Sequence, residues 1–464
     1  MNQYTKAYFV GAGGIGMAAL ERYCLSRGMA VAGYDRTPTA LTRALTSEGV
    51  QISYADSMEA VPAEFRNPAE TLVIYTPAVP AANVPLTFFR QGGFEVMKRS
   101  QFLGLVTRHS KAVCFAGTHG KTTTSSMAAH ILNTAPVGCN AFLGGILRNY
   151  NSNLLLSETS PFSVIEADEY DRSFHTLIPY IAVITATDPD HLDIYGTEEA
   201  YLESFAHFTE LIAHDGYLVV HTGLKLKPRP AASVTQYTYS RDAGTFHAAN
   251  IRRGNGTIVF DFVDERPGQA PINDIELGVP VEINIENAVA AIAGARLTGH
   301  ADDASIRKAI ATFMGPERRF QFWLKENIPG GHVIIDDYAH HPDELRQSIA
   351  SVKALYPDAR LAVAFQPHLY SRTRDFAPQF AQALSLADQV ILLDIYPARE
   401  LPIPGVTSQI VFDDITAPVK TLITKDQLVD TVARKADTFD VLLSVGAGDI
   451  CNSLPALVEA LKTK

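Results

Sequence analysis

The chain has 464 residues, and at roughly 150 residues per domain this length suggests about three domains. Hydrophobic residues make up 47% of it and charged residues 19%, which excludes a disordered chain of low hydrophobicity and high net charge. The formal net charge of −11 argues against nucleic acid as a partner, because binding to the phosphate backbone requires patches of Lys and Arg.

The cysteines and the apolar runs exclude two further classes of protein. Cys24, Cys114, Cys139 and Cys451 form no C-x-x-C pair, which excludes a disulfide scaffold and a cysteine-ligated zinc site. The sequence has no signal peptide and no stretch of about 18 apolar residues, so we expect no membrane partner. We therefore expect a cytoplasmic protein whose cysteines are buried free thiols.

The first part of the chain alternates between strand and helix signals. Strands are predicted at Ala7–Val10, Met29–Tyr34 and Thr71–Tyr75, and a helix is predicted at Met17–Arg27, closed by Gly28. Alternation of this kind is typical of a parallel sheet with helices on its faces, so the predicted fold class is α/β.

The same pattern restarts twice, which predicts three domains at residues 1–107, 108–314 and 315–464. After the first restart we expect a helix at Thr122–Leu132. The stretch 222–280 is rich in Gly, Pro and Thr, and we expect it to form an antiparallel insertion. The strands predicted after the two restarts are Lys111–Ala116, Phe162–Ile165, Tyr180–Thr185, Gly331–Asp336, Arg360–Phe365, Gln389–Leu393 and Val441–Val445.

A glycine-rich turn follows the first predicted strand and precedes the first predicted helix. It fits G-x-G-x-x-G, a pattern in which glycine lets the backbone turn tightly and approach a diphosphate at the helix N-terminus. Asp35 ends the next strand, where a carboxylate can accept a hydrogen bond from a ribose hydroxyl. The motif predicts a nucleotide-type ligand without distinguishing NAD from a UDP-linked ligand, and a turn needed only for packing is the plainer alternative. The turn consists of Gly11, Ala12, Gly13, Gly14, Ile15 and Gly16.

A second glycine-rich loop follows the strand predicted at Lys111–Ala116. The backbone N–H groups of such a loop cradle phosphates, Lys121 neutralises their charge, and the Thr122 hydroxyl reaches Mg²⁺. The spacing is G-x-x-G-K-T rather than the usual G-x-x-x-x-G-K-[ST]. The order of strand, loop and helix nevertheless favours ATP binding over a helix start without a ligand. The loop and the helix start consist of Gly117, Thr118, His119, Gly120, Lys121, Thr122 and Thr123.

Carboxylates follow the next two predicted strands. The run Glu166–Asp171 lies at a strand end after the phosphate loop, where a Mg²⁺ site is expected. His191 lies among the acidic residues of Asp188–Asp193 and is predicted to be a cation ligand. One Mg²⁺ seldom takes so many carboxylates, so several of them are expected to be solvated or capping residues.

Histidines and arginines gather in the last predicted domain. His340 and His341 are adjacent, so their side chains diverge, and no third zinc ligand is patterned. Contacts with an anion or substrate are therefore favoured over a zinc site. Arg318 and Arg319 form a pair of fork donors suited to phosphate or carboxylate, with surface arginines as the plain alternative.

Taken in chain order, these motifs resemble those of the Mur ligases of peptidoglycan synthesis. The resemblance covers essentially the whole chain, and the short phosphate loop is normal in this family. It implies a Rossmann-like domain that binds a UDP-linked substrate, a central P-loop ATPase-type domain, and a Rossmann-like C-terminal domain that closes over ATP and the amino acid. The motifs are Gly13–Met17, Gly117–Thr122, Glu166–Glu169, Asp190 with His191, Asn284 with Asn287, Arg318–Phe320 and Asp337–Pro342.

Residue by residue, the resemblance implies four sets of roles. Residues expected in catalysis are Lys121, Glu166, His191, His340 and Arg372. Residues expected to bind ATP are Gly117, Thr118, His119, Gly120, Lys121, Thr122, Thr123, Asn284, Asn287, Arg319 and Tyr338. Residues expected to bind the substrates are Gly13, Gly14, Ile15, Gly16, Asp35, Arg372 and Arg374. Two Mg²⁺ ions are expected, with Thr122, Glu166 and His191 as their protein ligands.

The resemblance is strongest to the alanine-adding branch of the family. That branch uses ATP to join L-alanine to the lactoyl carboxylate of UDP-N-acetylmuramate through an acyl phosphate. Segments Gln366–Arg374, Tyr396–Arg399 and Pro402–Gly405 favour it. So does the absence of lysine from Tyr201–Phe208, the region where other Mur ligases carry a carbamylated lysine. The alternative is the branch that attaches a recycled tripeptide to the same UDP-sugar.

Three positions depart from the family pattern. Ile283, Leu369 and Ala18 stand where His, Arg and Ser are common, so one nucleotide contact is expected to be missing and Leu369 is assigned no role.

Two alternative functions come from other classes of protein. A nicotinamide oxidoreductase would account for the first glycine turn but not for Glu166 and His191. A non-catalytic nucleotide switch would bind ATP yet release no phosphate.

Overall fold

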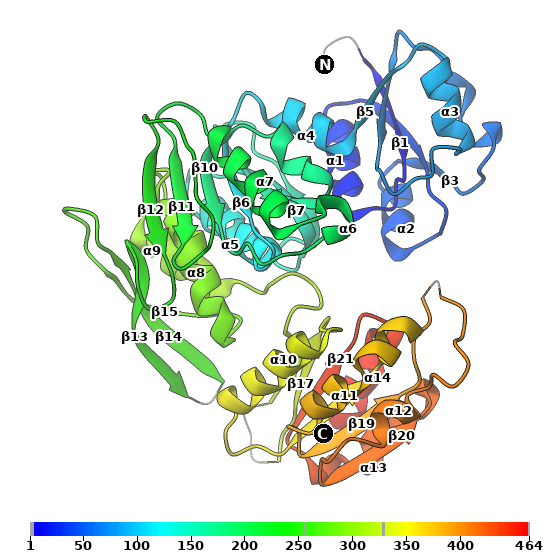
Figure 1. The fold of residues 1–464 in the computed structure, drawn as a ribbon, viewed down its shortest axis with the longest axis vertical. Helices are drawn as coiled ribbons and strands as arrows, with labels where there is room; N and C mark the ends of the chain where they lie inside the picture. Colours follow the sequence, from blue (N-terminus) through cyan, green and yellow to red (C-terminus); the bar gives the residue numbers. More distant parts are fainter. Residues whose placement is uncertain (1–3, 255, 327–329, 399, 463–464) are drawn as a thin grey trace. The chain divides into compact units, whose positions relative to one another are not determined.

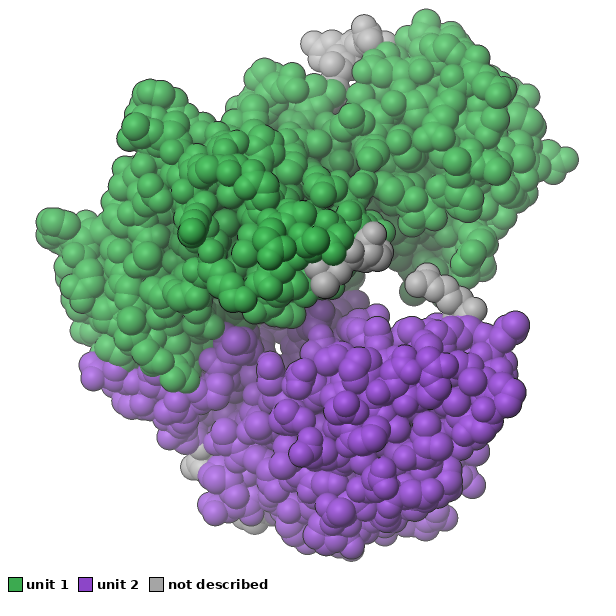
Figure 2. All heavy atoms as spheres, viewed as in Figure 1, with its two compact units in different colours: residues 1–249, 261–275, 285–313 green, residues 250–260, 276–284, 314–464 purple. Residues whose placement is uncertain are grey.

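The computed structural model describes residues 4–254, 256–326, 330–398 and 400–462, so Arg399 lies outside the described residues. Three sheets with associated helices make up the chain, and the predicted α/β class is confirmed (Figure 1). The domain boundaries near 107 and 314 stay predictions. In the described part of the chain, no helix is both long enough and apolar enough to cross a membrane. The chain divides into two compact units (Figure 2): unit 1 holds residues up to 249, 261–275 and 285–313, and unit 2 holds 250–260, 276–284 and the residues from 314 onward.

The first sheet, in unit 1, has five parallel strands in the order β3-β2-β1-β4-β5. Its central strand is apolar and buried on both faces: Ala7 and Phe9 pack into one core cluster, and Tyr8 and Val10 pack into another. The glycine turn follows β1 at the point where the strand order reverses, which is where ligands bind in such sheets. The elements are β1 (Lys6–Val10), α1 (Ile15–Ser26), β2 (Ala30–Tyr34), α2 (Ala40–Ser47), β3 (Gln51–Ser53), β4 (Thr71–Tyr75), α3 (Val84–Gln91), β5 (Glu95–Lys98) and α4 (Arg99–Thr107), with short 3₁₀ helices at Met58–Ala60 and Ala63–Phe65.

The predicted strand β4 is confirmed with the bounds expected for it, and the predicted strands β1 and β2 and the predicted helix α1 are confirmed with ends shifted by a residue or two. Strands β3 and β5 were missed. Both are short edge strands whose residues are exposed or only half-buried, so they carry no apolar run for a pattern to detect.

The second sheet has ten strands in the order β15-β14-β13-β12-β11-β10-β6-β9-β7-β8. The predicted strands β6, β9 and β10 and the predicted helix α5 are confirmed. The antiparallel pairing expected for 222–280 does not hold for β12, which pairs in parallel with β11 and β13, and the strands of this region continue the same ten-stranded sheet. The elements are β6 (Lys111–Ala116), α5 (Lys121–Thr134), β7 (Asn140–Leu147), β8 (Ser152–Leu155), β9 (Phe162–Ala167), η3 (Tyr170–Thr176), β10 (Pro179–Ile184), α6 (Leu192–Tyr195), α7 (Glu198–Glu210), β11 (Tyr217–His221), β12 (Thr235–Tyr239), β13 (Phe246–Gly254), β14 (Thr257–Asp264), β15 (Ile272–Glu276), α8 (Glu282–Arg296) and α9 (Asp303–Thr312).

The third sheet, in unit 2, has the order β16-β17-β21-β18-β19-β20. Only the pair of β16 with β17 is antiparallel, and the other pairs are parallel. The predicted strands β17, β18, β19 and β21 are confirmed, and all four are buried along their whole length. The elements are β16 (Gln321–Lys325), β17 (Val333–Asp337), α10 (Pro342–Leu355), β18 (Leu361–Phe365), α11 (Tyr370–Leu384), β19 (Gln389–Leu393), α12 (Gln409–Phe412), β20 (Val419–Ile423), α13 (Leu428–Arg434), β21 (Val441–Val445) and α14 (Leu454–Leu461), with 3₁₀ helices at Lys425–Gln427, Ala436–Thr438 and Asp449–Ser453.

Candidate active site

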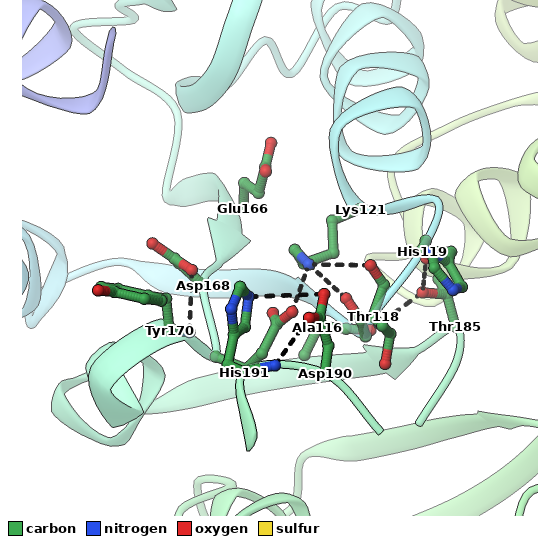
Figure 3. A network of polar contacts seen from close by, with 12 residues as sticks. Ala116, Thr118, His119, Lys121, Glu166, Asp168, Tyr170, Thr185, Asp190 and His191 are labelled. Atoms are coloured by element: carbon green, nitrogen blue, oxygen red, sulfur yellow. Dashed lines mark hydrogen bonds and ion pairs between the residues drawn. The ribbon is translucent and has the colours of Figure 1, made fainter. Parts of the chain in front are cut away.

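Three strand ends meet at one edge of the ten-stranded sheet. β6 pairs in parallel with β9 and β10, and its last residue, Ala116, lies opposite Ala167 on one side and Ile184 on the other. Because the carboxyl ends of parallel strands share an edge, the loops that follow these three strands gather there (Figure 3). This edge therefore carries the phosphate loop, the acidic segment after β9 and the segment that contains His191.

The phosphate loop has backbone conformations that favour glycine. Gly117 has φ +144° and Gly120 has φ +81°, and a Cβ on Gly117 would lie 2.2 Å from Thr185 Oγ1. Helix α5 begins at Lys121 with no side chain capping its N-terminus, and Thr123 follows half-buried in its first turn. Backbone N–H groups at an uncapped helix start form an arrangement that binds phosphate.

The other residues expected at the nucleotide surround this loop. Thr118 Oγ1 donates a hydrogen bond to the carbonyl oxygen of Asp188 at 2.7 Å. His119 is exposed, and its Nε2 lies 3.8 Å from Asp188 Oδ2. Thr124 Oγ1 donates to Asn287 Oδ1 at 3.2 Å, and this contact places Asn287 beside the loop.

Lys121 is held by acceptors of the protein. Its Nζ donates to the Gly117 carbonyl oxygen at 2.5 Å and to Glu169 Oε1 at 2.8 Å. The pKa of Glu169 is raised by burial, and the neighbouring Lys121 ammonium opposes that shift. Glu169 belongs to the motif Glu166–Glu169, but no role was predicted for it.

Thr122 and Glu166 form a second pair at the same helix start. Thr122 Oγ1 donates to Glu166 Oε1 at 2.9 Å, and the Gly144 backbone N–H donates to Glu166 Oε2 at 2.9 Å. Burial raises the pKa of the Glu166 carboxyl, while Lys121 and the Thr122 hydrogen bond act in the opposite direction. A carboxylate and a hydroxyl beside a phosphate-binding loop are the donors that suit Mg²⁺.

The protein atoms alone do not complete a metal site. Within the described residues, no three His, Cys, Asp or Glu side chains converge in a way that could hold a metal ion. Mg²⁺ usually takes one or two carboxylates together with substrate phosphates and water, so Thr122 and Glu166 fit its chemistry when a nucleotide supplies the other ligands.

His191 lies in a neighbouring cluster. It has a left-handed backbone with φ 52°, its Nε2 lies 3.7 Å from Asp190 Oδ2, and its ring meets that of Tyr170 edge to face at 5.1 Å. In Figure 3 the Glu166 carboxylate points away from this cluster. The structure thus places both predicted ligands at one edge of the sheet without bringing their side chains into contact.

The first glycine turn is organised by Asp35. Gly13 N donates to Asp35 Oδ2 at 2.7 Å, and Thr37 N donates to Asp35 Oδ1 at 3.1 Å. Asp35 therefore braces the turn itself, beyond the ribose contact predicted for it. Arg99 lies against the turn as well, because a Cβ on Gly16 would lie 2.7 Å from Arg99 Nη1.

In unit 2, two arginines flank Tyr338. The guanidinium carbons of Arg318 and Arg319 lie 5.0 Å and 5.6 Å from the centre of the Tyr338 ring. Arg318 also pairs with Asp336 at 3.3 Å, and burial raises the pKa of Asp336 to about 6 although Arg318 opposes the shift. Arg318 is therefore engaged within the fold, whereas Arg319 is exposed. Asn284 is buried, and its Nδ2 donates to the Val279 carbonyl oxygen at 3.1 Å.

The residues predicted to act on the amino-acid substrate follow strand ends of the third sheet. His340 Nδ1 lies 3.0 Å from the Tyr338 carbonyl oxygen. Burial lowers the pKa of His340, and the positive charge of Arg372 lowers it further. Arg372 is half-buried, but Arg374 is exposed and its Nε donates to Asp375 at 2.7 Å on the same helix.

Two residues that contact the site were not predicted from the sequence, and the reasons differ. Gly144 lies in β7, and a Cβ there would lie 2.3 Å from Glu166 Oε2. A glycine inside a strand does signal a close approach, so this one could have been found from the pattern. Arg99 gave no such signal, because its Nη2 reaches Asp168 Oδ2 at 3.0 Å only through the tertiary fold.

Comparison with known proteins matches the chain in three consecutive parts. The model described as "Mur ligase family, catalytic domain" matches residues 6–111, "Mur ligase middle domain" matches 115–295, and "Mur ligase, glutamate ligase domain" matches 318–448. The UDP-N-acetylmuramate–L-alanine ligase of Parabacteroides distasonis is 57% identical over 463 residues, which cover 100% of this chain and 97% of that protein.

Two solved structures resemble the whole chain. The crystal structure of the UDP-N-acetylmuramate–alanine ligase of Thermotoga maritima has a TM-score of 0.80 at 27% identity and covers 98% of each chain. The crystal structure of a murein peptide ligase from Psychrobacter arcticus has a TM-score of 0.63 at 20% identity and covers 99% of each chain. The second likeness is one of fold alone.

Proposed function

The chain belongs to the Mur ligase family, and we propose that it joins L-alanine to the lactoyl carboxylate of UDP-N-acetylmuramate, converting ATP to ADP and phosphate. The observation that carries this proposal is the 57% identity, over the whole chain, to a ligase of that name. The phosphate loop with Lys121 agrees with it, because ligation of this kind requires a nucleoside triphosphate.

The reaction has two chemical steps. The lactoyl carboxylate attacks the γ-phosphorus of ATP, the bond to the β-phosphate oxygen breaks, and ADP and an acyl phosphate form. The amine of L-alanine then attacks the acyl carbon, and the amide forms as phosphate leaves. Catalysis of this type depends mainly on positioning and on charge neutralisation.

Residues of unit 1 are proposed to handle the phosphates. The backbone N–H groups of Gly117–Gly120 cradle them, and the Lys121 ammonium offsets their charge. Thr122, Glu166 and His191 would hold Mg²⁺, in two sites, and the ion would supply further neutralisation of the phosphate oxygens. Asn287 lies against the phosphate loop and is proposed to contact the nucleotide.

The substrates are proposed to use two other groups of residues. The diphosphate of the UDP-sugar takes the turn Gly13–Gly16, braced by Asp35. In unit 2, His340 and Arg372 act on the amino acid in catalysis, together with Arg374. Arg319, Tyr338 and Asn284 are proposed for the nucleotide. The lowered pKa of His340 keeps its ring neutral near pH 7, as an acceptor for a proton requires.

The remaining assignments are proposed as well. We place the reaction in the cytoplasm, because this reducing compartment keeps thiols free. The free cysteines are Cys24, Cys114, Cys139 and Cys451. Domain 1–107 would bind the UDP-sugar, domain 108–314 would bind ATP, and domain 315–464 would close over ATP and the amino acid. The net charge of −11 supports small-molecule substrates rather than nucleic acid.

The test is phosphate release by the full-length protein with ATP, Mg²⁺ and UDP-N-acetylmuramate. L-alanine should stimulate release and yield the amide product, while the tripeptide should not. Stimulation by the tripeptide but not by L-alanine would assign the protein to the branch that attaches a recycled tripeptide. Absence of release with either would leave only nucleotide binding, and an absorbance change with NAD(P)H would revive an oxidoreductase.

A further inference from the structure

Glu169 is a buried carboxylate that the proposed mechanism does not use. The residue is 1% exposed, and its Oε1 accepts a hydrogen bond from Lys121 Nζ at 2.8 Å. Its Oε2 is buried and accepts no hydrogen bond from any residue that the structure describes. A buried polar atom without a partner destabilises the folded state, and more so when it is charged. Packing alone therefore does not explain a carboxylate at this position, and its contact with Lys121 is the feature to be explained.

The backbone at Glu169 is held firmly in place. The Tyr195 hydroxyl donates to the Glu169 carbonyl oxygen at 2.5 Å, and Arg172 N donates to the same oxygen at 3.0 Å. Just before it, the Asp168 carbonyl oxygen accepts from Phe174 N at 2.9 Å. The carboxylate is therefore presented to Lys121 from an anchored segment rather than from a free loop.

Lys121 has three N–H donors, and the structure accounts for each of them differently. One donates to the Gly117 carbonyl oxygen at 2.5 Å and one to Glu169 at 2.8 Å. Among the described residues the third has only the Thr118 carbonyl oxygen, at 3.5 Å, which is a weak contact. A phosphate oxygen can take this third donor while the other two bonds stay in place.

We propose that Glu169 is a positioning residue that holds the Lys121 ammonium over the phosphate loop with one donor directed at the phosphates of ATP. The inference rests on the proposed function. The lysine stem has four flexible carbons, and two fixed bonds remove most of that freedom before ATP arrives. Lys121 also lies between the carboxylate and the loop, where it shields the phosphates from the negative charge of Glu169.

The experiment compares Glu169→Gln and Glu169→Ala with the wild-type protein in the phosphate-release assay. Gln keeps the size of the side chain and an oxygen that can accept from Lys121, whereas Ala removes the anchor. We expect Glu169→Ala to lower kcat/KM for ATP by about tenfold to a hundredfold, as a misplaced catalytic group does. Glu169→Gln should stay within about threefold of wild type, and KM for the UDP-sugar and L-alanine should stay within about threefold in both variants.

Glu21→Gln serves as the matched control. Glu21 is also a fully buried carboxylate without a hydrogen-bond partner among the described residues, but it lies in α1, away from the phosphate loop in sequence and contact. The same chemical change there should leave kcat/KM for ATP unaltered. Thermal midpoints of all variants check that each protein is folded.

A double-mutant cycle separates positioning from a direct role. The probe is the β,γ-imido analogue of ATP with Mg²⁺, and its Kd is measured by calorimetry. Glu169→Ala should weaken binding about tenfold when Lys121 is present and within about twofold when Lys121→Ala is also present, because its effect passes through the lysine. A full-sized effect without Lys121, or a raised Mg²⁺ requirement in Glu169→Gln, would overturn the proposal.

Two other outcomes would also overturn it. One is a folded Glu169→Ala protein with kcat/KM for ATP within threefold of wild type. The other is a Gln variant as impaired as the Ala variant, since that would mean the acceptor oxygen does not suffice. If the wild-type protein itself fails to ligate L-alanine, the proposed function fails instead, and the calorimetric cycle still tests the role of Glu169 at the nucleotide.

Discussion

Replacing Gly144 by alanine should displace the Glu166 carboxylate and disable the proposed metal site. A Cβ at position 144 would lie 2.3 Å from Glu166 Oε2 and 2.5 Å from both Cδ and Oε1, so something must move. The carboxylate is the flexible partner. Its movement would break the bond from Gly144 N and the bond from Thr122 Oγ1, each 2.9 Å long.

The size of the effect follows from these two bonds. A hydrogen bond to a charged group contributes about 1.5–3 kcal/mol, so losing both would disorganise the site by about 3–6 kcal/mol. At about 1.4 kcal/mol per factor of ten, we expect phosphate release to fall at least a hundredfold at a fixed low Mg²⁺ concentration. Raising Mg²⁺ should restore part of the rate, because the remaining ligands can still bind the ion at higher concentration.

The control is Gly254→Ala. Gly254 also lies in a strand, has no left-handed backbone, and has open space where a Cβ would be added. Its replacement should leave activity and Mg²⁺ dependence unchanged. If folded Gly144→Ala protein works within threefold of wild type with the same Mg²⁺ dependence, the inferred role of Glu166 as a metal ligand is wrong.

Three further predictions concern other side chains. Lys121→Ala should lower ligation about a thousandfold or more without unfolding the protein, and near-normal phosphate release would remove the loop from the reaction. Glu166→Ala and His191→Ala should each raise the Mg²⁺ concentration needed for half-maximal turnover, and calorimetry should find UDP-sugar binding little changed; an unaltered Mg²⁺ requirement in both would exclude them as ligands. Burial raises the pKa of Glu21 well above its usual 4.5, so unfolding releases a proton at higher pH and wild-type stability should fall as pH rises from about 5, by at most about 1.4 kcal/mol per unit. Glu21→Gln should lack this slope, and parallel thermal midpoints of the two proteins between pH 5 and 8 would contradict the reasoning.

Much of the fold could be predicted because its central strands are continuous apolar runs. β4, β6, β19 and β21 were placed to the residue, and β1 was found from the same signal. The edge strands and the strand order could not be predicted, because a half-buried polar strand gives no local signal and pairing joins residues far apart in the sequence. The 222–280 region is an example: its short alternating runs predicted strands correctly, but not the sheet that they join.

The order of amino acids specifies which chemical groups the chain carries and in which order its loops present them. Gly117, Lys121 and Thr122 are neighbours along the chain between a predicted strand and a predicted helix, so this local order predicts a phosphate loop although the spacing is shorter than usual. The partners of these groups follow from the three-dimensional fold. Glu169 reaches Lys121 across 48 residues, and Gly144 reaches Glu166 from a different strand. A local sequence pattern predicts contacts between residues that are close together in the chain. The contact between a buried carboxylate and a particular cation depends instead on which strands pack side by side.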